Sequence, residues 1–118
     1  MLEGKRILLV EDEAVIAFAV EDMLVELGCT VVGPAYRVEE ALQLAQDAEI
    51  DAAILDVNLN DGRSYDVAEV LKVRDIPFLF ATGYAEGGIE WDGAEATLLA
   101  KPYRQDQVAL ALRDLLQN

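Results

Sequence analysis

Short runs of apolar residues alternate along the chain with longer segments in which apolar residues recur every three or four positions. The first run, residues 6–10, is apolar at every position after its arginine. A continuous apolar run of this length predicts a strand that is buried on both faces. Runs rich in apolar or β-branched residues also occupy 30–36, 52–56, 78–82 and 96–100. The chain is therefore expected to contain five strands.

Segments with helical periodicity fill the intervals between these strands. The first has an apolar stripe that consists of Ile16, Val20, Met23 and Leu27. Gly28 follows it, as glycine commonly does where a helix ends. The same spacing predicts further helices around 38–45, over 64–74 with Ser64 as its cap, and around 108–115. Because strands alternate with helices, we predict an open, doubly wound α/β domain with a five-stranded parallel sheet.

The segment between Thr82 and Ala96 does not follow this alternation. It contains four glycines, at positions 83, 87, 88 and 93. Each glycine inside a helix costs about 1 kcal/mol relative to alanine. We therefore predict a short or mobile element where a regular α/β alternation would place its fourth helix.

Length and charge narrow the classes of function. The 118 residues suit one domain spanning 1–118. The formal charge of −14 argues against direct binding to nucleic acid, and the absence of histidine excludes imidazole chemistry within the chain. The single cysteine, Cys29, cannot form an internal disulfide and is expected to be a small buried apolar residue. No apolar run approaches the roughly 18 residues of a membrane span, so we expect a cytoplasmic protein.

Polar residues that could bind a ligand or take part in a reaction gather where the predicted strands end. They are Glu11, Asp12 and Glu13 after the first strand, Asp56 on the third, Thr82 with Gly83 on the fourth, and Lys101 with Pro102 after the fifth. Each alone has an ordinary structural interpretation, such as a helix cap or a turn. In an open parallel sheet, however, the carboxyl ends of the strands meet at one edge. The occurrence of all these residues at one edge of the sheet therefore indicates a functional site.

Several converging carboxylates repel one another and are costly to desolvate. A hard divalent cation such as Mg²⁺ would relieve this repulsion. Asp56 is then the natural nucleophile for an aspartyl phosphate, with the cation and Lys101 neutralising the charge that develops. One alternative is an aspartate-nucleophile phosphatase or phosphotransferase. Such enzymes usually need a second carboxylate close after the nucleophile, and Asn58 cannot supply it.

The segments "ILLVEDE", "AAILDVNLNDG", "FATGY" and "LLAKPY" occur in this order and at appropriate spacing. With them the whole chain resembles the receiver domain of bacterial two-component response regulators, which implies a flavodoxin-like fold and no turnover activity on a free substrate. The implied site consists of Asp56 as phosphoacceptor; Glu11, Asp12, Asp56 and the Asn58 backbone carbonyl as ligands of Mg²⁺ or Mn²⁺; and Thr82, Lys101 and the backbone of Val57 and Gly83 as phosphoryl contacts. The resemblance also implies a cis Lys101–Pro102 bond. The implied phosphodonor is a histidine kinase or a histidine phosphotransfer protein.

One departure from the family concerns the switch. Leu98 stands where relatives usually carry tyrosine or phenylalanine, and "FATGYAEGG" resembles the start of the FAT GUY subfamily signature. Members of that subfamily often pair with kinases of the HWE type. Leucine cannot report phosphorylation by swinging a hydroxylated ring inward. We therefore expect ordering of residues 82–95 to replace that report.

The first predicted helix has a second apolar side, formed by Ala14, Ala17 and Phe18. A helix that is apolar nearly all round is usually buried or lies in an interface. The two interpretations are cover by the last helix and docking of a kinase or phosphotransfer helix bundle. The expected assembly is a monomer or a weak homodimer. A remaining alternative is a receiver that works as an interaction module without phosphorylation, against which the set of Asp56, Thr82 and Lys101 argues.

Overall fold

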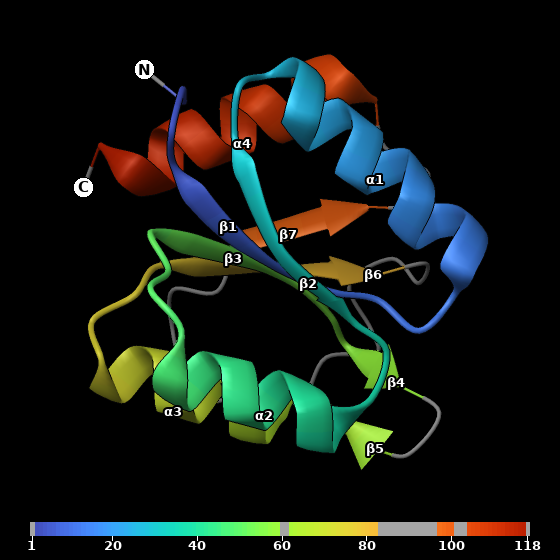
Figure 1. The fold of residues 1–118 in the computed structure, drawn as a ribbon, viewed down its shortest axis with the longest axis vertical. Helices are drawn as coiled ribbons and strands as arrows, with labels where there is room; N and C mark the ends of the chain where they lie inside the picture. Colours follow the sequence, from blue (N-terminus) through green and yellow to red (C-terminus); the bar gives the residue numbers. More distant parts are fainter. Residues whose placement is uncertain (1, 60–61, 83–96, 101–103, 118) are drawn as a thin grey trace.

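The computed structural model describes residues 2–59, 62–82, 97–100 and 104–117. Its centre is a five-stranded parallel sheet with the strand order β2-β1-β3-β6-β7. In the described part of the chain, α1 and α4 cover one face of the sheet, and α2 and α3 cover the other (Figure 1). The elements are β1 Arg6–Val10, α1 Ala14–Glu26, β2 Thr30–Ala35, α2 Val38–Asp47, β3 Ala52–Asp56, β4 Asn58–Leu59, β5 Gly62–Arg63, α3 Tyr65–Val73, β6 Phe78–Thr82, β7 Thr97–Ala100 and α4 Gln105–Leu116.

The predicted doubly wound parallel sheet is confirmed. Successive residues of β1 enter opposite layers, because strand side chains alternate between the two faces. Ile7 and Leu9 pack in the layer under α1 and α4, and Leu8 and Val10 pack in the layer under α2 and α3. Burial of both faces is the reason that the strand appears in the sequence as a continuous apolar run. The predicted fourth helix falls on residues 83–96, outside the described residues.

The buried face of α1 differs from the predicted stripe. Its fully buried residues are Ala17, Val20 and Leu24, while Ile16, Met23 and Leu27 are only partly buried at the edges of the contact. The helix is therefore turned relative to the prediction, so that Ala17 faces the sheet. The predicted end is confirmed, because Gly28 follows the last turn with φ +89°, a conformation that favours glycine.

Cys29 confirms its predicted role as a small buried residue. It lies in the core beneath α1 and α4, and its Sγ donates to the carbonyl oxygen of Leu2 at 3.6 Å. Burial raises the pKa of the Cys29 thiol. The residue is therefore a structural part of the core. Catalytic cysteines differ from it, because their lowered pKa makes the reactive thiolate available.

The prediction that Ser64 caps α3 through its side chain is wrong. Ser64 occupies the N-cap position, but its φ of −81° and ψ of 10° are not the extended conformation of a side-chain cap. Its Oγ is fully buried and has no hydrogen-bond partner among the described residues. The Ser64 backbone N–H instead donates to the Val57 carbonyl oxygen at 3.1 Å. A backbone contact to Val57, which lies between β3 and β4, therefore fixes the position of this residue.

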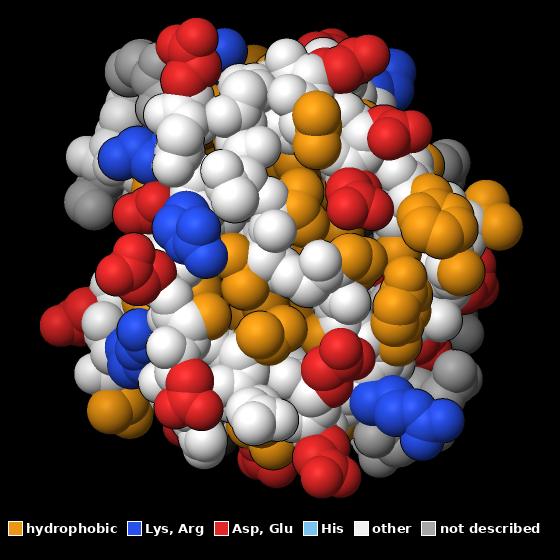
Figure 2. All heavy atoms as spheres, viewed as in Figure 1, with side chains coloured by type: hydrophobic (Ala, Val, Ile, Leu, Met, Phe, Trp, Pro, Cys, Tyr) orange, Lys and Arg blue, Asp and Glu red, His pale blue; other side chains and the backbone are white. Residues whose placement is uncertain are grey.

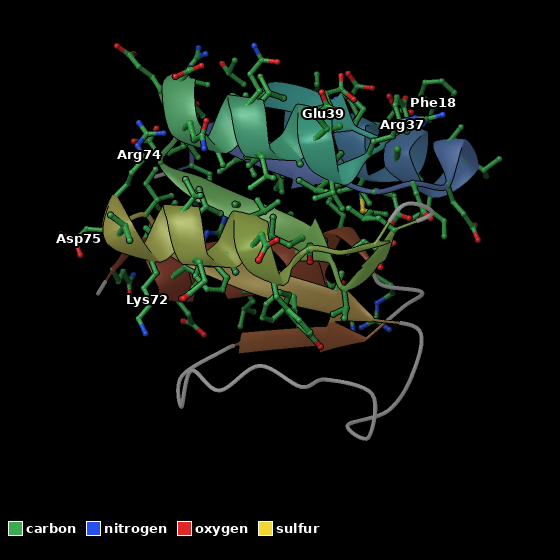
Figure 3. All side chains as sticks on the ribbon, turned by 90° about the horizontal axis from the view of Figure 1, so that it is seen from below. Phe18, Arg37, Glu39, Lys72, Arg74 and Asp75 are labelled. Carbon is green, nitrogen blue, oxygen red and sulfur yellow. The ribbon has the colours of Figure 1, made fainter. Side chains whose placement is uncertain are left out.

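Arg74, just after α3, stabilises the C-terminal end of α2. Its guanidinium donates to the carbonyl oxygens of Ala45 and, at 3.0 Å, of Ala48. Figure 3 shows Arg74 beside the neighbouring ends of these two helices. The last carbonyls of a helix have no intrahelical partner, and α2 has no basic residue in its own last turn. Arg74 supplies both the donors and the positive charge.

We expect Arg74→Ala to lower the free energy of unfolding by about 1–2 kcal/mol, because these charge-assisted hydrogen bonds are partly exposed. Urea denaturation would measure the change. Lys72→Ala is the matched control, since Lys72 is an exposed cation on the same helix, and its effect should stay within about 0.5 kcal/mol. Equal losses for the two variants would contradict the assigned role of Arg74.

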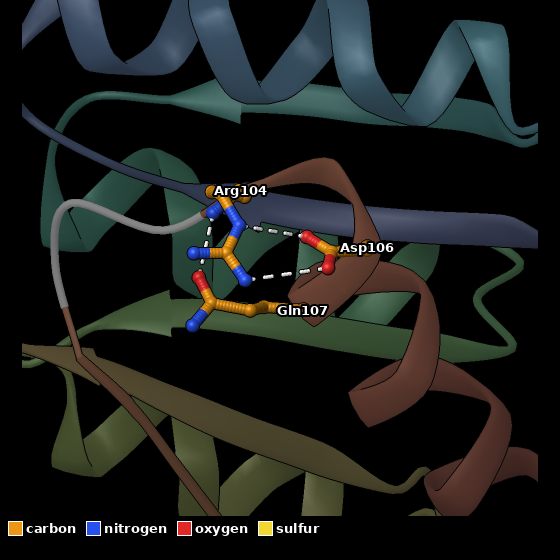
Figure 4. A network of polar contacts seen from close by, with 3 residues as sticks. All are labelled: Arg104, Asp106 and Gln107. Atoms are coloured by element: carbon orange, nitrogen blue, oxygen red, sulfur yellow. Dashed lines mark hydrogen bonds and ion pairs between the residues drawn. The ribbon is translucent and has the colours of Figure 1, made fainter.

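The N-terminal end of α4 has a polar network of three residues (Figure 4). The Arg104 backbone N–H donates to Gln107 Oε1 at 2.7 Å. The Arg104 guanidinium donates to Asp106 Oδ1 and Oδ2 at 3.1 and 3.3 Å. This hydrogen bonding, together with the positive charge of Arg104, holds the pKa of Asp106 below its ordinary value. The stabilisation from this pair is complete above the ordinary carboxyl pKa and is lost as the pH falls through the lowered pKa.

We expect Arg104→Ala to raise the pKa of Asp106 toward its ordinary value, because the hydrogen bonds and the positive charge of the Arg104 guanidinium disappear while the backbone hydrogen bonds of Asp106 and Gln107 remain. A ¹³C NMR titration of the aspartate carboxyl groups would measure it. Arg113→Ala is the control, since Arg113 lies two turns further along α4. An unchanged pKa of Asp106 in Arg104→Ala would contradict the assignment.

Candidate metal centre

The predicted acidic residues lie at the point where the strand order reverses. β1 has β2 on one side and β3 on the other. The two central strands run parallel, and Val10 is in register with Leu55. Glu11 and Asp12 follow β1 directly, and Asp56 is the last residue of β3. Doubly wound sheets bind ligands at this place, outside the carboxyl ends of the strands.

The structure brings three of the predicted ligands together. Glu11, Asp12 and Asp56 each offer a carboxylate oxygen, and these atoms all lie within 4.8 Å of one another. Glu11 is 1% exposed and Asp56 is 7% exposed, whereas Asp12 is half-buried. Two of the carboxylates are thus largely withdrawn from water, where repulsion between like charges is strongest.

Glu11 is held by two backbone contacts. Its N–H donates to the carbonyl oxygen of Ala35, the last residue of β2, at 3.0 Å. Its Oε2 accepts a hydrogen bond from the Glu13 N–H at 3.2 Å, immediately before α1 begins. The first contact ties the residue to the edge strand, and the second orients its carboxylate. Asp12, the most exposed of the three, presents the open side of the cluster.

The carboxylate cluster fits a hard divalent cation. Three oxygen ligands from side chains, with room for water beside the half-buried Asp12, match the preference of Mg²⁺ for few carboxylates plus waters. Among the residues that the structure describes, this is the one group of three or more acidic, histidine or cysteine side chains that meets such a distance criterion. A cation here would also offset the mutual repulsion of the carboxylates.

A short hairpin that the sequence analysis missed continues the chain from Asp56. β4 and β5 form an antiparallel pair in which Asn58 is opposite Arg63 and Leu59 is opposite Gly62. Asn58 is the residue whose carbonyl is expected to ligate the cation, so the hairpin carries one of the predicted ligands. Strands of two residues are too short to show a period in the sequence, and "LNDG" has the composition of a simple turn.

The described residues include only part of the predicted phosphoryl-binding site. The Val57 N–H donates to the Ala81 carbonyl oxygen at 3.3 Å, so contact with a phosphoryl group would require this weak bond to be shared or exchanged. The backbone of Thr82 ends β6, one residue beyond Ala81, which is in register with Asp56. Gly83, Lys101 and Pro102, with the predicted cis bond, lie outside the described residues, as do the side chains of Thr82 and Leu98.

Comparison with known proteins agrees with this arrangement. A family model described as "Response regulator receiver domain" matches residues 7–113. The chain belongs to this family. It is therefore a receiver domain of the kind used in two-component signalling. The FAT GUY subfamily is compatible with these findings and stays a prediction.

The receiver domain is similar to several characterised proteins. The phyllosphere-induced regulator PhyR of Methylorubrum extorquens is 34% identical over 114 residues, which are 93% of this chain and 43% of PhyR. The chain thus spans less than half the length of that relative. The solution structure of SdrG from Sphingomonas melonis Fr1 is 47% identical, with a TM-score of 0.85 over 98% of this chain and 99% of SdrG. The BeF3-activated conformation of SdrG gives a TM-score of 0.81 with the same identity and coverage.

A further solved receiver domain bears on the metal centre. The receiver domain of the sensor histidine kinase PA1611 from Pseudomonas aeruginosa PAO1 is 25% identical, with a TM-score of 0.87 over 98% of this chain and 99% of that one. Its structure has a magnesium ion coordinated in the active site cleft.

In the described part of this chain, no helix is long and apolar enough to cross a membrane.

Proposed function

We propose that the receiver domain accepts a phosphoryl group on Asp56 and thereby switches its contacts with other proteins. The observation that carries this proposal is the placement of Asp56 at the end of β3, with carboxylate oxygens of Glu11 and Asp12 within 4.8 Å. The similarity to SdrG, which has a BeF3-activated conformation, supports it. The domain assists its own phosphorylation and dephosphorylation and is no turnover enzyme.

The donor in this proposal is a phosphohistidine on a histidine kinase, of the HWE type, or on a histidine phosphotransfer protein. An Asp56 carboxylate oxygen forms a bond to phosphorus while the P–N bond to the donor histidine breaks. The imidazole leaves with the electron pair and takes up a proton. Lys101 and the Thr82 hydroxyl bind the oxygens of the transferred group, and the Gly83 backbone adds a donor.

Mg²⁺ or Mn²⁺, held by Glu11, Asp12, Asp56 and the Asn58 carbonyl, supplies charge neutralisation at the reacting oxygens. Glu11 contributes from a fixed, buried position, since its backbone and its carboxylate are both hydrogen-bonded. Asp12 is half-buried and lies on the solvent side of the site. The magnesium ion coordinated in the active site cleft of the PA1611 receiver domain supports a magnesium site in this domain as well.

The test is to incubate the full chain with MgCl₂ and a small phosphodonor and to compare it with Asp56→Asn by intact mass. We expect a phosphoryl adduct in the wild type and at least about a 100-fold lower yield in the variant, which lacks the nucleophilic oxyanion. Steady release of phosphate from varied substrates would support the aspartate-nucleophile phosphatase instead. Absence of an adduct with small donors and with a cognate kinase would support an interaction module without phosphorylation.

The exposed side of α1 is the proposed docking surface for the donor. Val15 is 80% exposed and Phe18 is 58% exposed, and Ala14 beside them is exposed as well. Ala17, which the sequence analysis placed with this group, is fully buried, so that part of the prediction is wrong. Figure 2 shows apolar side chains over the N-terminal half of α1, with acidic side chains nearby.

We expect Phe18→Glu to slow phosphotransfer from a cognate kinase at least about tenfold, because a charge would enter the apolar centre of the contact. Single-turnover transfer from the phosphorylated kinase would measure it. Val73→Glu is the matched control, since Val73 is 86% exposed on α3, on the other side of the sheet. Equal transfer rates for both variants would argue against docking on α1, and thermal melts would show that both remain folded.

The remaining expectations complete the proposal. Residues 1–118 act as one cytoplasmic receiver domain, as a monomer or a weak homodimer, without direct contact to nucleic acid or membrane. Ordering of residues 82–95 reports phosphorylation in place of an aromatic at Leu98. That segment lies largely outside the described residues. Hydrogen exchange of the free and BeF3-bound chain would test it, and equal protection in both states would contradict it.

A further inference from the structure

The β4–β5 hairpin determines how the Asn58 carbonyl is presented. In an antiparallel pair, residues that exchange hydrogen bonds alternate with residues that do not. The Ser64 N–H donates to the Val57 carbonyl oxygen at 3.1 Å, one step before the Asn58–Arg63 pair. Asn58 and Arg63 are therefore a pair that exchanges no hydrogen bonds. The Asn58 carbonyl consequently points away from β5 and lies outside the hairpin ladder.

Two groups maintain this register. The first is the Ser64 N–H, whose bond to Val57 is shielded from water because both residues are buried. The second is Gly62, opposite Leu59, which has a φ of +148°. L-amino acids with a side chain rarely adopt this conformation. A Cβ built on Gly62 would lie 3.5 Å from Val38 Cγ2, which is an ordinary contact distance. Conformation, and not lack of space, is thus the reason for glycine here.

We propose that Gly62 and the Ser64 N–H are positioning groups for the divalent cation. They act through Asn58: both hold the hairpin in the one register that keeps the Asn58 carbonyl outside the ladder, available as an oxygen ligand next to Asp56. A shift of the hairpin by one residue would turn that carbonyl into the ladder. The inference rests on the proposed function, since the cation is the one proposed there.

The experiment is a titration of the full chain with MgCl₂ at constant ionic strength, followed by ¹H–¹⁵N NMR to obtain Kd. Gly62→Ala places a side chain at a φ that alanine disfavours. We expect about tenfold weaker Mg²⁺ binding, the loss that is typical when a group that orients a metal ligand is changed. Ser64→Pro removes the backbone donor together with the hydroxyl, and φ −81° at Ser64 and the strand conformation at Arg63 both suit proline. We expect a loss of about the same size.

Two controls separate the positioning role from general effects. Gly4→Ala places alanine at φ +77° with nothing within 4 Å, before the start of β1 and thus at the opposite end of the sheet from the site. Ser64→Ala keeps the N–H and removes only the unpaired hydroxyl. Both should bind Mg²⁺ as the wild type does. Amide spectra establish that each variant is folded, and either Gly62→Ala or Ser64→Pro suffices if the other does not fold.

The outcomes distinguish the two proposals. If the wild type binds Mg²⁺ through Asp12 and Asp56 while Gly62→Ala and Ser64→Pro bind it equally well, the positioning role is refuted and the proposed function stands. If Gly4→Ala loses as much affinity as Gly62→Ala, the effect is a general one and the positioning role is refuted too. If the wild type binds no Mg²⁺ at all, the cation in the proposed function is refuted together with this inference.

Discussion

Asp56→Asn is expected to stabilise the cation-free domain and to abolish its stabilisation by Mg²⁺. The substitution preserves the shape of the side chain and removes one of three carboxylates whose oxygens lie within 4.8 Å of one another. At this spacing, and at the effective dielectric of a partly buried site, each of the two repulsions removed, with Glu11 and with Asp12, is worth about 1–3 kcal/mol. The free energy of unfolding without cation should rise by an amount of that order.

The same variant should lose its response to the cation. A ligand at ten times its Kd stabilises the wild type by about 1.4 kcal/mol through mass action. Without the Asp56 carboxylate, added MgCl₂ should change the free energy of unfolding by less than about 0.5 kcal/mol. Urea denaturation in EDTA and in MgCl₂ would measure both effects for the wild type and the variant.

Asp22→Asn supplies the control, since it makes the same change of charge on the exposed surface of α1. It should leave both the stability and the response to MgCl₂ close to those of the wild type, because exposed charges are screened. A variant at Asp56 that still gained stability from MgCl₂ as the wild type does would refute this residue as a ligand.

Phe80→Ala is expected to lower the free energy of unfolding by about 3–5 kcal/mol. Phe80 is fully buried in the middle of β6. Its ring makes edge contacts with Tyr65 at 5.8 Å and with Phe78 at 5.5 Å between centroids. Truncation removes these contacts and leaves a cavity between the sheet and α3. Since the free energy of unfolding of a whole domain is only about 5–15 kcal/mol, this one substitution would remove a large fraction of it.

Chemical denaturation at 25 °C would measure the loss, with Leu110→Ala as the control. Leu110 is 61% exposed on α4, and its truncation should cost less than about 0.5 kcal/mol. Phe80→Leu keeps most of the volume and should cost less than about 1.5 kcal/mol. Similar losses for Phe80→Ala and Leu110→Ala would show that the core beneath α3 does not depend on this ring.

Phe80 also connects the core to the site. It is in register with Leu55 on β3, directly before the pair formed by Asp56 and Ala81. On its other side it is in register with Leu98 on β7. The residue thus lies between the strand that carries the phosphoacceptor candidate and the strand that carries the atypical switch position.

The sequence by itself determined the architecture and the acidic site. Parallel strands covered on both faces must be continuously apolar, which made the runs at Arg6–Val10 and Ala52–Asp56 recognisable with their observed limits. The rule that strand carboxyl ends meet at one edge then predicted that Glu11, Asp12 and Asp56 would converge. Both inferences depend only on the local pattern and on a general property of the fold.

Tertiary structure alone decided the features that depend on neighbours distant in the chain. The burial of Ala17 follows from how α1 is rotated over the sheet, and many rotations agree with a helix that is apolar nearly all round. The capping of α2 joins Arg74 to Ala45 and Ala48, which are 29 and 26 positions earlier in the chain. The β4–β5 pairing replaces the expected side-chain cap at Ser64 with a backbone bond to Val57. None of these contacts leaves a period in the sequence, because each is set by the packing of one element against another.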